Sequence, residues 1–199
     1  SCVNVKSLSI PESVVSIGSY AFYEFEAIDR LVIPGNVKEL GRSAFARCCF
    51  ETLILEKGIE KIGESAFYNC YNLKELAIPE SVTELGEDAF DGTLWLENQE
   101  DGTVYINNVL YTYKGVFPES TSLEILHKTI SISPKAFFNC SNFRSIKLPI
   151  ELSSIGDKAF YGCTSLIEID IPNNVEYIGI SSFENCKSLM SIKLTNNDK

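Results

Sequence analysis

The segment Leu76-Ala-Ile-Pro-Glu-Ser-Val-Thr-Glu-Leu-Gly-Glu-Asp-Ala-Phe90 decides the fold, because variants of it recur along nearly the whole chain. Its final residue returns at intervals of 23, 22, 23, 47, 23 and 23 residues, as Phe22, Phe45, Phe67, Phe90, Phe137, Phe160 and Phe183. A period of this length predicts a solenoid, in which each coil buries its apolar face against its neighbours.

Each part of the repeated segment predicts a part of one coil. The triplet Leu76-Ala-Ile78 alternates apolar and outward positions, which predicts a short strand with one buried face. A Pro follows in five copies and ends the strand, because it cannot donate a ladder hydrogen bond. The later Leu85-Gly86 pair suits either a positive φ at the Gly or a close approach of two backbones. We expect the Ala-Phe pair to lie in a short helical turn.

The 47-residue interval between Phe90 and Phe137 interrupts the pattern. Val104-Tyr-Ile106, the pair Asn107-Asn108 and the alternating run 109–114 predict a β-hairpin with a two-residue turn. This coil, at about residues 94–122, lacks its Phe and carries a set of aromatic residues: Trp95, Tyr105, Tyr111, Tyr113 and Phe117. They either fill the gap left by the Phe or project towards a partner, since Tyr and Trp are enriched at interface hot spots.

The consensus Ile-Pro-x-x-Val-x-x-Ile-Gly-x-x-Ala-Phe-x-x-Cys-x-x-Leu resembles the BspA-like leucine-rich repeat over nearly the whole chain. The resemblance implies an α/β-type repeat solenoid that is mostly β: right-handed, with a concave parallel sheet, a convex side of short turns or helical segments, and one hairpin. We expect one domain of residues 1–199, belonging to a longer array. The family implies a non-enzymatic adhesion or binding role at the surface of bacteria or protists, with ligands that differ between members.

Composition excludes several classes of partner. The net charge is −10, and 17 basic residues are scattered among 27 acidic ones, which disfavours nucleic acid and anionic membranes. No apolar run approaches the roughly 18 residues needed to span a bilayer, so we expect no membrane insertion. The N-terminal residues do not have the pattern of a signal peptide. An extracellular or cell-surface location is therefore an expectation from the family resemblance.

The seven cysteines predict reduced thiols in a ladder. Five occur once per coil, as Cys48, Cys70, Cys140, Cys163 and Cys186, without the close spacing of a metal site. Stacked parallel side chains suit disulfide geometry poorly, and Cys also packs as a small apolar residue. Cys2 and Cys49 lie outside this ladder. We expect Cys49 to be the most reactive thiol.

We expect no catalytic residue, cofactor or metal ion. His127 is the only histidine, and no nucleophile motif accompanies it, so a surface position is the simpler interpretation. The sequence Asn139-Cys-Ser141 matches a glycosylation sequon, but its Cys belongs to the ladder, and we interpret the match as chance.

The candidate partner-binding surface is the outward face of the strands together with the hairpin. An apolar strip rimmed by polar residues can mark a partner site, although the same pattern also suits a solvated sheet face. We expect a monomer that recognises a protein or a glycan, and the alternative is a structural spacer without a ligand of its own. The candidate residues are Arg30, Val32, Thr52, Ile54, Glu75, Ala77, Tyr105, Tyr111 and Tyr113.

Overall fold

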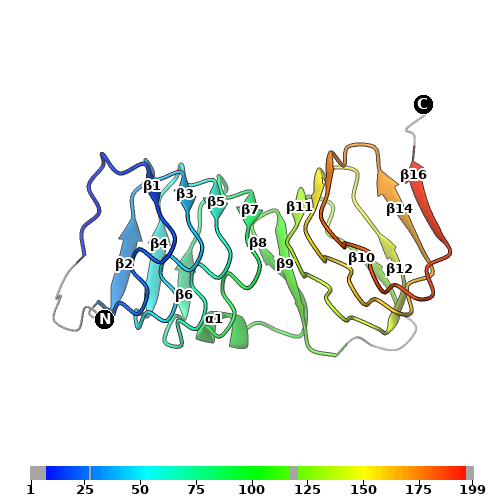
Figure 1. The fold of residues 1–199 in the computed structure, drawn as a ribbon, viewed down its shortest axis with the longest axis horizontal. Coiled ribbons are helices and arrows are strands. Elements are labelled where there is room, and N and C mark those ends of the chain that lie inside the picture. Colours follow the sequence, from blue (N-terminus) through cyan, green and yellow to red (C-terminus); the bar gives the residue numbers. More distant parts are fainter. Residues whose placement is uncertain (1–7, 27, 117–120, 196–199) are drawn as a thin grey trace. The chain divides into compact units, whose positions relative to one another are not determined.

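The computed structural model describes residues 8–26, 28–116 and 121–195. In these residues the chain is a mostly β solenoid of parallel strands, as the repeat predicts (Figure 1). Two compact units divide it, Ser1–Gln99 and Glu100–Lys199. Each unit has a sheet of longer strands and a sheet built mainly from two-residue strands, here called the long-strand sheet and the short-strand sheet.

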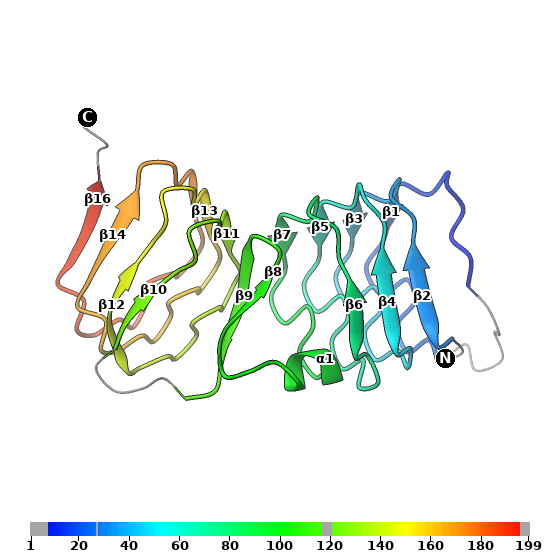
Figure 2. The same cartoon turned by 180° about the vertical axis from the view of Figure 1, so that it is seen from behind.

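In the first unit the long-strand sheet contains three parallel strands, β2 (Arg30–Ile33), β4 (Thr52–Leu55) and β6 (Glu75–Ala77). Figure 2 shows these strands side by side. The short-strand sheet contains β1 (Ser16–Ile17), β3 (Glu39–Leu40), β5 (Lys61–Ile62) and β7 (Glu84–Leu85). Leu31 pairs with Leu53, and Leu53 with Leu76, so one repeat of the sequence is one coil of the chain.

The second unit repeats this arrangement and adds the hairpin. Its long-strand sheet contains β10 (Thr121–Glu124), β12 (Phe143–Lys147), β14 (Glu168–Pro172) and β16 (Ser191–Thr195). Its short-strand sheet contains β9 (Val109–Lys114), β11 (Ser131–Ile132), β13 (Ser154–Ile155) and β15 (Tyr177–Ile178). β8 (Gly102–Ile106) pairs antiparallel with β9, which confirms the predicted hairpin. Asn107 has the positive φ that such a turn requires.

The Phe column is a stack of nearly parallel rings inside the coils. In the first unit, ring centroids are 4.9 Å apart for Phe22 and Phe45, and 5.3 Å apart for Phe67 and Phe90. The Phe67 side chain has no exposed surface. Burial of one such ring stabilises the fold by roughly 1.5–3 kcal/mol, so the column contributes strongly to cohesion between coils.

The Ala-Phe pair lies in turns, so the prediction of a helical turn there is wrong. In every coil that carries the Phe, the residue two before it has a positive φ: Tyr20, Ser43, Ser65, Asp88, Lys135, Lys158 and Ser181. A left-handed residue cannot continue a right-handed helix. Instead, Tyr20 and Phe22 donate their N–H groups to the carbonyls of Arg42 and Ala44 in the next coil, at 2.9 and 2.8 Å. Within the described residues the α-helix is α1 (Leu94–Glu97).

The Gly of the aliphatic-Gly pair lies where the backbones of two coils approach each other closely. Gly86 has no positive φ, but a Cβ added to it would lie 2.3 Å from the Glu64 nitrogen. Gly18, in the first coil, has no neighbouring atom within 4 Å of such a Cβ. The Gly is therefore needed wherever another coil precedes it.

Tyr113 takes the place of the missing Phe, which agrees with the first of the two interpretations of the hairpin aromatics, that they fill the gap left by the Phe. Its N–H donates to the Ala136 carbonyl at 2.8 Å, as the Phe67 and Phe137 N–H groups do to the equivalent carbonyls of Ala89 and Ala159. Its ring lies 6.2 Å from that of Phe137. Trp95 belongs to α1 rather than to the hairpin and packs edge-on against Phe90. Phe117 lies outside the described residues.

The substitution Phe67→Ala tests the Phe column. Because the ring is fully buried between two stacked neighbours, we expect a loss of about 3–5 kcal/mol in the free energy of unfolding. Urea denaturation followed by circular dichroism measures it. Tyr71→Ala, at an exposed aromatic residue, is the control and should change stability by less than about 0.5 kcal/mol. Equal effects of the two changes would contradict the assignment.

Substitutions of two glycines test whether the Gly is required by the close approach of two coils or by its own backbone conformation. Gly86→Ala should lower the free energy of unfolding by about 1–3 kcal/mol, because its methyl group would meet the backbone of the preceding coil. Gly18→Ala should change it by less than about 0.5 kcal/mol. The same denaturation assay compares both variants, and a large effect of Gly18→Ala would show that the conformation of the Gly matters instead.

Candidate binding surfaces

Six of the predicted site residues lie side by side on the outward face of the first long-strand sheet. Arg30, Thr52 and Glu75 form one row across β2, β4 and β6, because they are direct pairing partners. Val32, Ile54 and Ala77 form a second row beside it. All six side chains are exposed or half-buried, and Val32 is 38% exposed. We call these two rows the β2–β6 face.

The β2–β6 face combines an apolar row with a polar row of mixed charge. Thr52 Oγ1 donates to Glu75 Oε2 at 3.1 Å, so one carboxylate oxygen of Glu75 already has a hydrogen-bond partner within the row. Arg30 has no ion-pair partner among the described residues. An exposed guanidinium and a neighbouring aliphatic strip can contact a partner without first breaking a contact inside this chain.

The matching face of the second unit has a different character. The row Glu124, Lys147, Asp170 and Lys193 alternates in charge across the sheet. Lys147 lies 2.7 Å from Glu124, and Lys193 lies 3.7 Å from Asp170 and 3.5 Å from Glu168. Exposed ion pairs of this kind stabilise the fold little, but they occupy the charges that a partner would otherwise meet.

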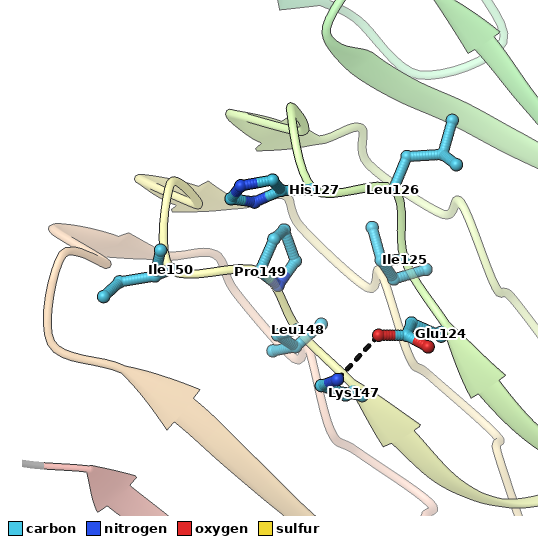
Figure 3. Close-up of a pocket in the computed structure, with 8 residues that line it drawn as sticks. All are labelled: Glu124, Ile125, Leu126, His127, Lys147, Leu148, Pro149 and Ile150. Carbon is cyan, nitrogen blue, oxygen red and sulfur yellow. Dashed lines mark hydrogen bonds and ion pairs between the residues drawn. The ribbon is translucent and has the colours of Figure 1, made fainter.

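An open groove of about 640 Å³ lies where β10 and β12 end (Figure 3). Residues 124–127 line one side and residues 147–150 the other. Leu126 and Ile150 are exposed, and the Glu124–Lys147 ion pair lies among the lining residues. We did not predict this groove from the sequence. Its one sequence signal is Leu126, which stands where five other coils have Pro.

The hairpin aromatics mainly join the hairpin to the coils. Tyr111 is only 3% exposed, so its side chain offers little surface to a partner. Tyr113 fills the Phe position, and the Tyr105 hydroxyl accepts a hydrogen bond from the Leu126 N–H at 3.2 Å. Contact of Tyr105 and Tyr113 with a partner stays a prediction, while the packing role of these residues is visible in the structure.

His127 lies on the surface, as predicted. Its side chain is 81% exposed, and Nδ1 lies 2.8 Å from Glu151 Oε2 in the next coil. Asn139 of the sequon is also exposed, and its N–H donates to the Tyr161 carbonyl. In the part of the chain that the structure describes, no group of three His, Cys, Asp or Glu side chains is placed to hold a metal ion.

The ladder cysteines are thiols with a hydrogen-bonding role. All six described cysteines are free, and Cys2 lies outside the described residues. Cys70 Sγ donates to the Phe45 carbonyl of the preceding coil at 3.1 Å, and Cys163 Sγ to the Phe137 carbonyl at 3.2 Å. Burial raises the pKa of Cys70, and it raises the pKa of Cys140 to about 11. Cys49 is exposed.

Thiol modification should separate Cys49 from the ladder. At pH 8 in the folded protein we expect Cys49 to react quickly, while Cys70 and Cys163 react only after denaturation, because burial keeps both reagent and water away. Cys140 should stay protonated until the pH approaches 11. A colorimetric thiol assay with and without denaturant measures this. Cys49→Ser should remove one fast-reacting thiol, and an unchanged fast phase in this variant would contradict the assignment.

The repeated coils, the parallel sheets and the ladder of turns define a leucine-rich-repeat solenoid. The family model described as BspA type leucine rich repeat region matches residues 1–113 and 105–199, with six copies. The chain therefore belongs to the BspA-type leucine-rich-repeat family. No curated protein sequence gives a match to this chain.

Several solved structures of bacterial leucine-rich-repeat proteins are similar to this chain. The T. pallidum protein TpLRR is 24% identical, covers 89% of this chain and 72% of its own length, with a TM-score of 0.43. A protein from Eubacterium ventriosum is 22% identical, with coverage of 90% and 57% and a TM-score of 0.42. A protein from Bacteroides ovatus is 24% identical, covers 93% of this chain and 59% of its own length, and has a TM-score of 0.41. The chain thus spans less than two thirds of the length of the last two.

A search of the described helices for a membrane span finds none that is long and apolar enough.

Proposed function

We propose that this chain is a non-enzymatic binding or adhesion module of a cell-surface or secreted leucine-rich-repeat protein, and that it recognises a protein or a glycan. The observation that carries the proposal is the β2–β6 face, where an outward apolar row lies beside Arg30, which has no ion-pair partner among the described residues. A rigid sheet presents such a row in one fixed geometry, which lowers the entropy cost of binding.

The chemistry of the chain supports binding rather than catalysis. The described residues bring together no nucleophile with a general base, and the exposed His127 faces only Glu151. The acidic net charge of −10 disfavours nucleic acid as the partner. A surface location follows from the family resemblance and belongs to the same proposal, as does the expectation that no cofactor is needed.

The second candidate function is a structural spacer without a ligand. The observation in its favour is the alternating row of the second unit, where Glu124, Lys147 and Lys193 are engaged in ion pairs with neighbouring strands. A sheet face whose charged side chains form ion pairs with one another is well solvated and leaves few unpaired charges for a partner to contact.

An array of glycans and extracellular-matrix proteins, probed with this chain at micromolar concentration, tests the proposal. For any binder found, Val32→Glu with Ile54→Glu should weaken binding by at least about tenfold, because a partner's apolar surface would then face two carboxylates. Ile150→Glu, at an exposed aliphatic residue of the groove, is the matched control and should leave binding unchanged.

Three outcomes decide between the candidates. Loss of binding only with the β2–β6 variant supports the proposed site. Loss only with Ile150→Glu would move the site to the groove of β10 and β12. Absence of any binder on the array would favour the spacer.

A further inference from the structure

Arg30 differs from most basic residues of its unit in its electrostatic surroundings. It is exposed on β2 and forms no ion pair with any of the described residues. The chain as a whole has a net charge of −10, so acidic partners are plentiful. Five described basic residues of the first unit do form ion pairs with acidic side chains, namely Lys38, Arg42, Arg47, Lys61 and Lys74.

The acidic residue in the same row as Arg30 is too far away to pair with it. Glu75 lies on β6, two strands from β2, and adjacent strands are about 4.8 Å apart, so roughly 10 Å separates the two backbone positions. Thr52 lies between them, and its hydroxyl donates to Glu75 Oε2 at 3.1 Å. The guanidinium of Arg30 is therefore available to an anion from outside this chain.

The aliphatic row lies at a distance from this charge that matches an extended peptide. Arg30 and Val32 are two residues apart on one strand and point to the same side, which separates them by about 6.6 Å. The side chains on one side of an extended peptide have the same spacing. A peptide that lies along the strands, which Figure 2 shows side by side, can therefore contact both rows at once.

We propose, building on the proposed function of the β2–β6 face, that its partner is an extended polypeptide segment in which an Asp or Glu lies two residues from an aliphatic residue. The carboxylate binds the Arg30 guanidinium through two parallel N–H···O hydrogen bonds, a geometry that the planar guanidinium favours. The aliphatic side chain packs on Val32 and Ile54 and is removed from water.

This mode of binding does not depend on a free strand edge. The contact is made by outward side chains above the sheet, and the backbone groups of β4 stay paired with β2 and β6. Coils pack edge to edge, so a further coil beside β2 would widen the face and would not cover it.

The aliphatic row favours a peptide over a glycan. None of the six residues of the β2–β6 face is aromatic, so the face has no ring on which a sugar can stack. Sugar hydroxyls held against Val32 and Ile54 would lose hydrogen bonds to water without gaining partners in the protein. An acidic glycan can pair with Arg30 but gains nothing from the apolar row, whereas the proposed peptide gains from both rows.

A phage-displayed library of random peptides, selected on the whole chain, is the first test. The selected peptides should carry Asp or Glu two residues from Val, Ile or Leu more often than the unselected library does. A parallel selection on the variant Val32→Glu with Ile54→Glu identifies peptides that bind elsewhere on the chain, and these are set aside.

Substitution of Arg30 then tests the ion pair with a synthetic copy of a selected peptide. Arg30→Gln should weaken binding at least about tenfold, and Arg30→Lys, which keeps the charge but not the planar fork, at least about threefold. Lys147→Gln is the matched control, because this outward basic residue is already paired with Glu124, and it should leave the affinity unchanged. Isothermal titration calorimetry measures the affinities, and circular dichroism confirms that each variant is folded.

Replacement of the peptide carboxylate by an amide completes a double-mutant cycle. The replacement should weaken binding to the unsubstituted chain at least about tenfold but change binding to Arg30→Gln little, because the same contact is already lost there. If the two losses multiply instead, the carboxylate and Arg30 do not contact each other and the inference is wrong.

The remaining outcomes separate this inference from the proposed function. Selected peptides that lack a carboxylate, or that bind Arg30→Gln as well as the unsubstituted chain, would overturn the inference alone. So would a glycan that binds through the β2–β6 face when the library yields no peptide for it, and that result would support the proposed function. Absence of any binder from both the library and the array would overturn both.

Discussion

A repeated hydrogen bond, from the N–H of one Phe to the carbonyl of the residue before the next Phe, sets the register of the coils. It joins Phe22 to Ala44 and Phe45 to Ala66, at 2.8 Å in both cases. Because this contact recurs coil after coil, equivalent residues lie directly over one another, and the rings stack at centroid distances near 5 Å. The stack of rings, the strand pairing and the glycine contacts all require this register.

The same register explains how one coil can differ from the others. Tyr113 lies 23 residues after Phe90 and 24 before Phe137, so the hairpin adds strand without displacing the aromatic position. Its N–H makes the register-setting hydrogen bond to Ala136. The coil therefore depends on the geometry at this position more than on the identity of the residue, since a phenol ring with a polar hydroxyl can occupy it.

The sequence predicts the solenoid, the buried columns and the hairpin, because these depend on apolar spacing and turn residues. It does not predict the left-handed turns, since the positions that require a positive φ hold residues as different as Tyr20, Ser43 and Lys158. Of the candidate site, the alternation along each strand predicts which residues face outward. Which charged side chains form ion pairs depends on pairing across strands, so the sequence identifies Lys147 and Arg30 alike only as outward basic residues, although Lys147 pairs with Glu124 in the structure.

The register of the coils also allows the outward residues to change without any change in the buried columns. A residue such as Val32 or Lys147 lies between buried neighbours on the same strand, so its identity can change without disturbing a column. The turns and buried columns have no such freedom, because each coil packs against the next through the same repeated contacts. The outward residues can therefore change from coil to coil, whereas the residues of the turns and buried columns are constrained by the contacts that hold one coil to the next.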